Sequence, residues 1–317
     1  MKIFNNPNIS KKYQKSSLAI GNFDGVHKGH QKVFENVKKH AKKYKLKFGI
    51  LTFSPLPVMF FNKKIKNYRL ASEDEKFKLF KKYGADFTIN IKFNKNFSRI
   101  SAENFIKKII YKKINPKQIF VSNNFKFGNK RKGNVNLLKK FGKKYKYRLL
   151  KISPLKSKGK VISSTRIRGC LQKGKIELAN NLLSRNWFIS GQVIEGRKVG
   201  RKLGYRTCNI FIKKYILPKL GIYSVKVMIV GKKNIYNGVA YLGSRPTFKG
   251  KKIFLETYIF GIKKNLYKKR LRIYFLKFIR KDQKFRNSAE LIRRMNKDVI
   301  LAKKGLKTKL IVWVKKI

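Results

Sequence analysis

The first half of the chain alternates short apolar runs with segments whose apolar residues recur at helical spacing. The runs that predict strands are SLAIGNF (17–23), KFGILTF (47–53), DFTINIKF (86–93) and QIFVS (118–122). The segments that predict helices are His27–Tyr44, EDEKFKLFKKYG (73–84) and SAENFIKKIIYKK (101–113), the last with Ser101 as its cap. This alternation predicts a mostly parallel, doubly wound sheet, in which ligands bind beyond the carboxyl ends of the strands.

The pattern changes near residues 183–188, after a helical stretch, TRIRGCLQKGKIELANNLL (165–183). Five strand-like runs separated by glycine-bearing turns follow: WFISGQVIEG (187–196), IYSVKVMIVG (222–231), NIYNGVAYLG (234–243), KIFLETYIFG (252–261) and RLRIYFLKFIR (270–280). Their spacing is typical of a small antiparallel barrel. A final helix is expected over 288–306. We therefore expect two domains, 1–183 and 184–317.

Composition agrees with two globular domains. Hydrophobic residues make up 42% of the 317 residues. No apolar run approaches the ~20 residues that a membrane-spanning helix needs. The amino terminus lacks the apolar core and cleavage site of a signal peptide, so a cytoplasmic location is expected. The two cysteines and three histidines do not form a zinc-like cluster, so no structural metal is expected.

The formal net charge of +69 admits two interpretations. Lysine and arginine bind nucleic-acid phosphates, which would indicate a basic nucleic-acid-binding protein. However, pairs of basic residues are spread from Lys11 to Lys316 rather than gathered in one patch. Compositional drift of surface positions explains this spread better, so we expect weak non-specific binding to polyanions and no specific nucleic-acid partner.

GNFDGVHKGH (21–30) lies where a strand ends and a helix begins. Its glycines allow the backbone to approach a ligand closely. His27 and His30 are three residues apart, so on a first helical turn they project together. Two imidazoles beside a helix amino terminus suit a phosphate on which charge develops. A surface turn with two incidental histidines is the alternative.

This string resembles the amino-terminal module of bacterial bifunctional riboflavin kinase/FAD synthetases, which belong to the H-x-G-H nucleotidyltransferases. Three further stretches resemble the same family in the same order: LTFSPLPVMF (51–60), VSNNFKFGNKRKG (121–133) and VISSTRIRGCL (161–171). Two positions depart from the family pattern, where Leu56 replaces a histidine and Ser122 replaces a glycine.

The resemblance implies that FMN phosphate attacks the α-phosphorus of ATP, with His27 and His30 stabilising the reacting centre. It implies an ATP site made of Gly21, Phe23, Asp24, Ser164, Thr165 and Arg168. The last three of these would hold the departing phosphates. The flavin-binding residues would be Asn124, Phe125 and Phe127. Core packing is an equal alternative for the two phenylalanines, and Asp24 has bracing of its glycine-rich turn as an alternative.

GRKVGRKLGYRTCNI (196–210) resembles the riboflavin kinase segment that ends in Thr-x-Asn. The resemblance implies that Mg-ATP binds at Gly200, Lys202, Thr207 and Asn209. Thr207 and Asn209 would ligate Mg²⁺, since a hydroxyl and an amide oxygen are suitable hard ligands. Arg206 and Cys208 replace the usual proline and alanine, which adds a charge beside the nucleotide.

Glu256 lies inside an apolar strand pattern, where a carboxylate is costly without a partner or a task. The resemblance identifies it with the general base that deprotonates riboflavin. An outward-facing strand residue is the alternative. The resemblance also implies flavin contacts from Tyr223, Arg280 and Phe285.

The resemblance covers nearly the whole chain and implies synthesis of FMN and then FAD, with ATP as co-substrate. Most departures fall in the kinase half, where Tyr241, Gly261 and Asn265 also replace usual residues. An enzyme that retains only FAD synthesis is therefore the nearer alternative, and a basic nucleic-acid-binding protein the distant one. The oligomeric state stays open.

Overall fold

The computed structural model describes residues 1–196, 204–247, 250–262 and 264–305. By its contacts the chain divides into two units. The sheet unit comprises Met1–Lys66 and Ser72–Ser163, and the barrel unit comprises Asn67–Ala71 with the described residues from Ser164 onward. The short segment Asn67–Ala71 thus leaves the sheet unit and packs with the barrel.

The sheet unit is a three-layer α/β structure, as the sequence predicts. Its six strands are all parallel, in the order β1-β4-β3-β2-β5-β6. They are β1 (Lys2–Phe4), β2 (Ser17–Ile20), β3 (Phe48–Ser54), β4 (Phe87–Lys92), β5 (Gln118–Ser122) and β6 (Arg148–Ile152). The strand order reverses between β2 and β5, which is where ligands bind in such sheets.

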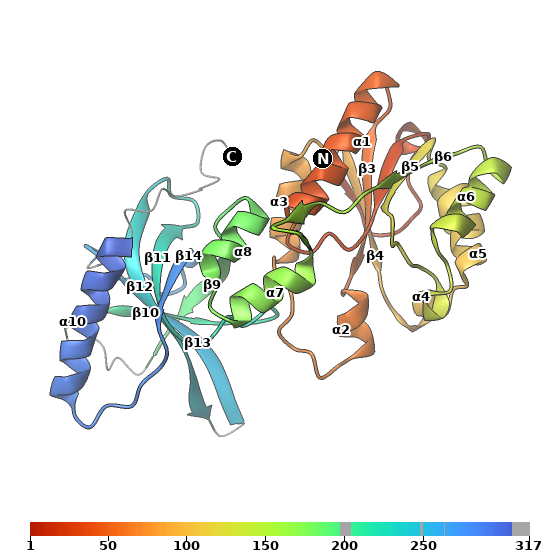
Figure 1. Ribbon diagram of the computed structural model, residues 1–317. Coiled ribbons are helices and arrows are strands. Elements are labelled where there is room, and N and C mark those ends of the chain that lie inside the picture. The colour runs from red at the N-terminus through yellow and green to blue at the C-terminus, as the bar shows by residue number, and fades with distance from the viewer. Residues whose placement is uncertain (197–203, 248–249, 263, 306–317) are drawn as a thin grey trace. The chain divides into compact units, whose positions relative to one another are not determined.

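Helices cover both faces of this sheet (Figure 1). The main ones are α1 (Lys28–Lys43), α3 (Glu73–Lys82), the π-helical η2 (Phe105–Ile114) and α6 (Val135–Lys144). Apolar residues of α1 and α3 pack on one face, with Phe34 and Phe80 fully buried. Residues of η2 and α6 pack on the other face, with Ile110 and Leu138 fully buried.

Short elements complete the sheet unit. They are η1 (Lys11–Tyr13), α2 (Pro57–Phe61), α4 (Lys95–Ser98), α5 (Ala102–Asn104), η3 (Asn129–Arg131) and the two-stranded ribbon β7 (Lys156–Ser157) and β8 (Lys160–Val161). The expected cap is confirmed, because the Ser101 hydroxyl accepts a hydrogen bond from the Asn104 amide at 3.1 Å.

The barrel unit is built around a closed antiparallel barrel, in the order β10-β13-β12-β11-β14-β9. Its strands are β9 (Phe188–Ile194), β10 (Thr207–Phe211), β11 (Gly221–Ile229), β12 (Ile235–Thr247), β13 (Gly250–Ile259) and β14 (Arg270–Arg280). Five of these strands match the predicted runs, and β10 comes from the segment interpreted as a ligand loop. The predicted barrel is therefore confirmed.

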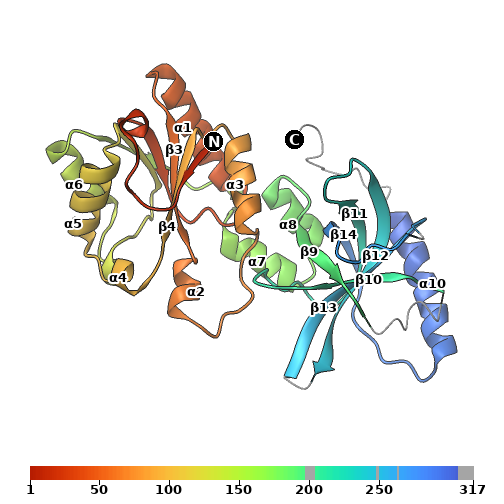
Figure 2. The same ribbon diagram turned by 180° about the vertical axis from the view of Figure 1, so that it is seen from behind.

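Three helices join the barrel: α7 (Ser164–Gln172), α8 (Ile176–Leu183) and α10 (Ser288–Gly305). α10 lies along the outside of the barrel (Figure 2). α8 is tied to the barrel by Asn180, which donates to the Phe275 carbonyl at 2.9 Å and accepts from the Trp187 amide at 2.8 Å. The residues from 164 to 183 thus pack with the barrel, although their motif resembles the first module.

Candidate active sites

The turn that follows β2 is unusually shaped. Phe23, Gly25 and Val26 all have left-handed backbone conformations, with φ of 48°, 76° and 41°. Such a conformation is strained for a β-branched residue, and strain of this kind gathers at functional sites. The turn is held by two hydrogen bonds, from Thr52 Oγ1 to the Asn22 carbonyl at 3.1 Å and from Gln31 Nε2 to the Val26 carbonyl at 2.8 Å.

His27 and His30 project together, as their spacing predicts. His27 is the residue before α1, and His30 lies in its first turn. The two rings stack with centroids 3.6 Å apart. The edge of Phe23 packs on His30 at 5.2 Å, and a Cβ at Gly29 would meet the His27 ring at 3.2 Å. Both imidazoles are therefore held in place at the amino end of a long helix, where anions bind.

The other predicted residues of the sheet unit differ in their exposure. Phe23 and Asp24 are each 4% exposed, and the Phe23 ring packs against Phe34 and Phe80. Phe127 is 7% exposed within the core, with the half-buried Phe125 stacked on it at 5.5 Å. These contacts support the packing alternative for Phe125 and Phe127. Asn124 is exposed.

Ser164, Thr165 and Arg168 lie together on α7, which belongs to the barrel unit, whereas His27 and His30 belong to the sheet unit. Ser164 is half-buried and Thr165 is exposed. Arg168 is buried, and its guanidinium lies 3.7 Å above the ring of Tyr68. Its Nε also donates to the Tyr68 carbonyl at 2.9 Å.

On the barrel, three predicted residues meet on one face. Thr207 and Asn209 are two apart on β10, so their side chains point the same way. Asn209 is paired directly with Glu256 across β10 and β13, and Glu256 is paired with Tyr241 on its other side. Directly opposed side chains in antiparallel strands have Cβ atoms about 4.5–5.5 Å apart. Strand register thus brings the predicted general base beside the predicted magnesium ligands.

A pocket of about 270 Å³ opens at the start of β10. Its lining includes Arg206, Thr207, Cys208, Asn209, Asn265 and Tyr267. Three of the residues that depart from the family pattern therefore share this pocket: Arg206, Cys208 and Asn265. Burial raises the pKa of the Cys208 thiol to about 11. Gly200 and Lys202 lie outside the described residues.

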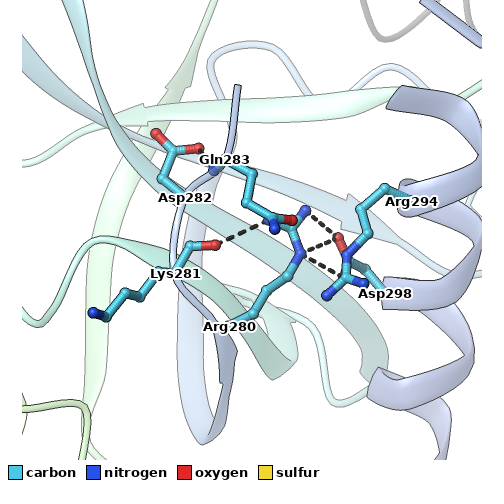
Figure 3. A network of polar contacts seen from close by, with 6 residues as sticks. All are labelled: Arg280, Lys281, Asp282, Gln283, Arg294 and Asp298. Carbon is cyan, nitrogen blue, oxygen red and sulfur yellow. Dashed lines mark hydrogen bonds and ion pairs between the residues drawn. The ribbon is translucent and has the colours of Figure 1, made fainter. Parts of the chain in front are cut away.

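The predicted flavin-binding residues of the barrel contact other side chains and main-chain groups of the barrel unit. Tyr223 is fully buried and packs against Phe275 and Phe278, with its hydroxyl donating to the Lys219 carbonyl. Arg280 pairs with Asp298 of α10 at 2.6 Å, and Figure 3 shows how the two side chains meet. The guanidinium of Arg280 also lies 5.8 Å from the centroid of the Phe285 ring.

Sequence reasoning missed a buried lysine near the first site. Lys76 is 3% exposed, and its Nζ donates to Thr52 Oγ1 at 3.1 Å, the same hydroxyl that donates to Asn22. Nothing distinguishes this residue among 82 lysines and arginines. It also missed Asp298, which the rarity of acidic residues, 13 in all, could have marked.

Among the described residues, no three His, Cys, Asp or Glu side chains gather as a metal site, and no helix is long and apolar enough to cross a membrane. The sheet unit has two stacked histidines at the point where its strand order reverses. The barrel unit has threonine, asparagine and glutamate on one strand face. Together these features define a two-module transferase that acts on nucleotides.

Comparison with known proteins shows which family of transferases this is. The FAD synthetase family matches residues 9–166, and the riboflavin kinase family matches residues 183–306. The chain is 41% identical over 300 residues to the bifunctional riboflavin kinase/FMN adenylyltransferase of Buchnera aphidicola subsp. Schizaphis graminum, covering 94% of this chain and 96% of that protein. It is 32% identical over 286 residues to the Escherichia coli K12 enzyme of the same name, covering 90% and 91%.

The chain therefore belongs to the bifunctional riboflavin kinase/FMN adenylyltransferase family, and it carries both catalytic domains. A solved Streptococcus pneumoniae structure described as a macrolide-efflux protein has the same fold, with a TM-score of 0.83 and 26% identity, covering 95% of this chain and 98% of that one. The efflux description concerns that protein and adds nothing to the site described above.

Proposed function

We propose that the barrel phosphorylates riboflavin to FMN and that the first module adenylylates FMN to FAD. The observation that carries the kinase assignment is the pairing of Glu256 with Asn209 across two strands, beside a pocket of about 270 Å³. For function we keep the division into 1–183 and 184–317, because the α7 motif belongs with the first reaction even though α7 packs with the barrel.

In the first reaction, Glu256 takes the proton of the riboflavin 5′-hydroxyl as that oxygen attacks the γ-phosphorus of ATP. A bond forms between the ribityl oxygen and phosphorus, the bond from the γ-phosphorus to ADP breaks, and FMN and ADP result. Tyr223, Arg280 and Phe285 border the flavin in this proposal. Because Tyr223 is fully buried, it acts by shaping the barrel wall. Gly200 and Lys202 stay in the proposal as nucleotide-binding residues.

Magnesium suits the residues at this pocket. Asn209 Oδ1 is buried and has no hydrogen-bond partner among the described residues, and the Thr207 hydroxyl lies on the same strand face. Hard oxygen ligands of this kind favour Mg²⁺, which also binds substrate phosphates. Mg²⁺ held there would neutralise charge on the phosphates of ATP.

In the second reaction, a phosphate oxygen of FMN attacks the α-phosphorus of ATP, and pyrophosphate leaves. His27 and His30 donate hydrogen bonds to the oxygens on which charge develops. The main chain of Gly21, Phe23 and Asp24 borders ATP, while Ser164, Thr165 and Arg168 bind the departing phosphates. Asn124, Phe125 and Phe127 line the flavin region, where the buried Phe127 acts by supporting the stacked Phe125.

The test is to incubate the purified chain with Mg-ATP and either riboflavin or FMN, and to separate riboflavin, FMN and FAD over time. The wild type should form FAD from both. E256Q should stop only the riboflavin step, by at least about 100-fold. A double substitution of His27 and His30 by alanine should stop only the FMN step. Each variant is the matched control for the other.

FAD from FMN but not from riboflavin in the wild type would mean that the departures at Arg206, Cys208 and Asn265 have disabled the kinase. No turnover from either substrate would refute the enzyme proposal and favour the basic nucleic-acid binder. We place the reactions in the cytoplasm, where ATP is available, with binding to polyanions weak and non-specific.

A further inference from the structure

We propose that Tyr68 is a positioning residue for the adenylylation reaction, because it holds Arg168 in the orientation needed to bind the departing phosphates. This inference rests on the proposed role of Arg168. Tyr68 lies far from the α7 motif in sequence, outside every motif quoted above. It is brought to Arg168 only by the excursion of Asn67–Ala71 into the barrel unit.

Two contacts fix the plane of the Arg168 guanidinium. Its Nε donates to the Tyr68 carbonyl at 2.9 Å, and its central carbon lies 3.7 Å from the centroid of the Tyr68 ring. The hydrogen bond fixes the position of one edge of the planar guanidinium, and the contact with the ring fixes the direction of its face. A guanidinium binds phosphate oxygens as a planar fork, so the direction of its plane decides which oxygens it can reach.

Tyr68 is itself held firmly. Its amide and that of Arg69 both donate to the Lys214 carbonyl, at 3.0 and 2.8 Å, and the Ile216 amide donates to the Arg69 carbonyl at 2.8 Å. The Trp187 indole donates to the Leu70 carbonyl at 2.8 Å, and Leu70 is 1% exposed. Residues of the barrel unit therefore hold the segment that contains Tyr68, and Tyr68 in turn holds the guanidinium of Arg168.

This arrangement removes conformational freedom before ATP binds. An arginine side chain carries about 2 kcal/mol of rotamer entropy. A guanidinium fixed in advance spends less of the binding energy on ordering itself. Loss of the Tyr68 ring should therefore weaken binding of the departing phosphates about tenfold, while the contacts to FMN stay unchanged.

The experiment compares Y68A, Y68L and Y68F in the full chain. It measures KM for ATP and for FMN in the FMN-to-FAD reaction, inhibition of that reaction by pyrophosphate, and the rate of riboflavin phosphorylation. Y68A and Y68L should raise KM for ATP and the inhibition constant of pyrophosphate about tenfold, with KM for FMN and the kinase rate unchanged. All three variants keep the main-chain carbonyl of residue 68, and Y68F also keeps the aromatic ring, so Y68F should match the wild type. Y111A, at an exposed tyrosine with no assigned role, is the control.

R168A separates failure of this inference from failure of the proposed function. If R168A weakens ATP and pyrophosphate binding but Y68A and Y68L do not, the positioning role is wrong and the function stands. If R168A has no effect, both the role of Arg168 and this inference are overturned. If Y68A and Y68L lower the kinase rate and the melting temperature as much as they affect ATP, Tyr68 is only structural. If Y68A does not fold, the comparison of Y68L with Y68F decides.

Discussion

Removal of the Asp298 carboxylate should strongly destabilise the barrel unit. Asp298 is 3% exposed, and Arg280 donates to it three times, at 2.9, 3.1 and 2.6 Å (Figure 3). The side chain of Arg280 is itself only 12% exposed. A second guanidinium, that of Arg294, lies 3.6 Å from the same carboxylate.

The magnitude follows from what D298A leaves behind. Breaking a buried ion pair by removal of one partner costs about 3–5 kcal/mol, because the other charge stays buried and uncompensated. Here two guanidiniums lose their shared anion, in a chain with only 13 acidic residues to replace it. A domain of this size is stable by about 5–15 kcal/mol, so D298A should remove a large part of the stability of the barrel unit. D298N keeps one acceptor and should cost about 2 kcal/mol.

Urea unfolding measures this effect. The chain has two tryptophans, and W313F leaves Trp187, which is 1% exposed and packs on Phe275, as the reporter of the barrel unit. D282N in the same background is the control, because Asp282 is exposed and accepts hydrogen bonds from the Tyr241 hydroxyl at 2.8 Å and the Gln283 amide at 2.9 Å. A D298A protein within about 1 kcal/mol of the wild type, at an equal urea slope, would refute the reasoning.

Three further outcomes follow from other sites. Burial, and then nearby cations, lower the pKa of His40 in the folded chain below the value of 6.5 in the unfolded chain. As pH drops below 6.5 the unfolded chain therefore binds a proton at His40 more readily than the folded chain does, so stability should fall, and H40Q should make that fall smaller. Burial raises the pKa of both thiols, that of Cys208 to about 11, so a disulfide reagent at pH 8 should react slowly until urea is added. A Cβ at Gly243 would lie 2.0 Å from the Tyr241 hydroxyl, so G243A should cost about 1–3 kcal/mol and Y241N should restore most of it.

Each of these three has a contrary result. A pH profile of unfolding that H40Q leaves unchanged would show that His40 has the same pKa in both states. Rapid labelling of the native thiols at pH 8 would contradict the raised pKa values of Cys170 and Cys208. Additive costs in the double variant G243A/Y241N would show that the two side chains do not compete for one space.

The sequence predicted most elements because each carries its own periodic signal. The run at 118–122 and the helix beginning at Ser288 were predicted to the residue at those points. β10 was missed, because a stretch rich in glycine, arginine and threonine resembles a ligand-binding loop more than a strand. Its fifth residue, Phe211, pairs with Phe254 in the barrel, so tertiary packing decides this strand.

The candidate sites were only partly predictable, for a different reason. The spacing of Thr207 and Asn209 indicates that they share a strand face. That Glu256 lies opposite Asn209 depends on strand register, which a single sequence does not contain. The contact between Tyr68 and Arg168 depends on hydrogen bonds from Asn67–Ala71 to the segment at Lys214–Ile216, and neither segment carries a local signal of the other.

Because acidic residues are rare in this chain, the positions where they occur indicate where the fold needs a carboxylate. The chain has 82 basic and only 13 acidic residues. Three of the acidic residues have structural partners: the buried Asp298 pairs with Arg280 and so anchors α10, the exposed Asp86 accepts the Phe48 amide of β3 at 2.8 Å, and the half-buried Glu75 completes a capping box with Ser72 at the start of α3. Each of these carboxylates satisfies groups that no lysine could satisfy, since lysine has no acceptor. These carboxylates therefore stand where the fold needs a hydrogen-bond acceptor, and the general-base role proposed for Glu256 would need one as well.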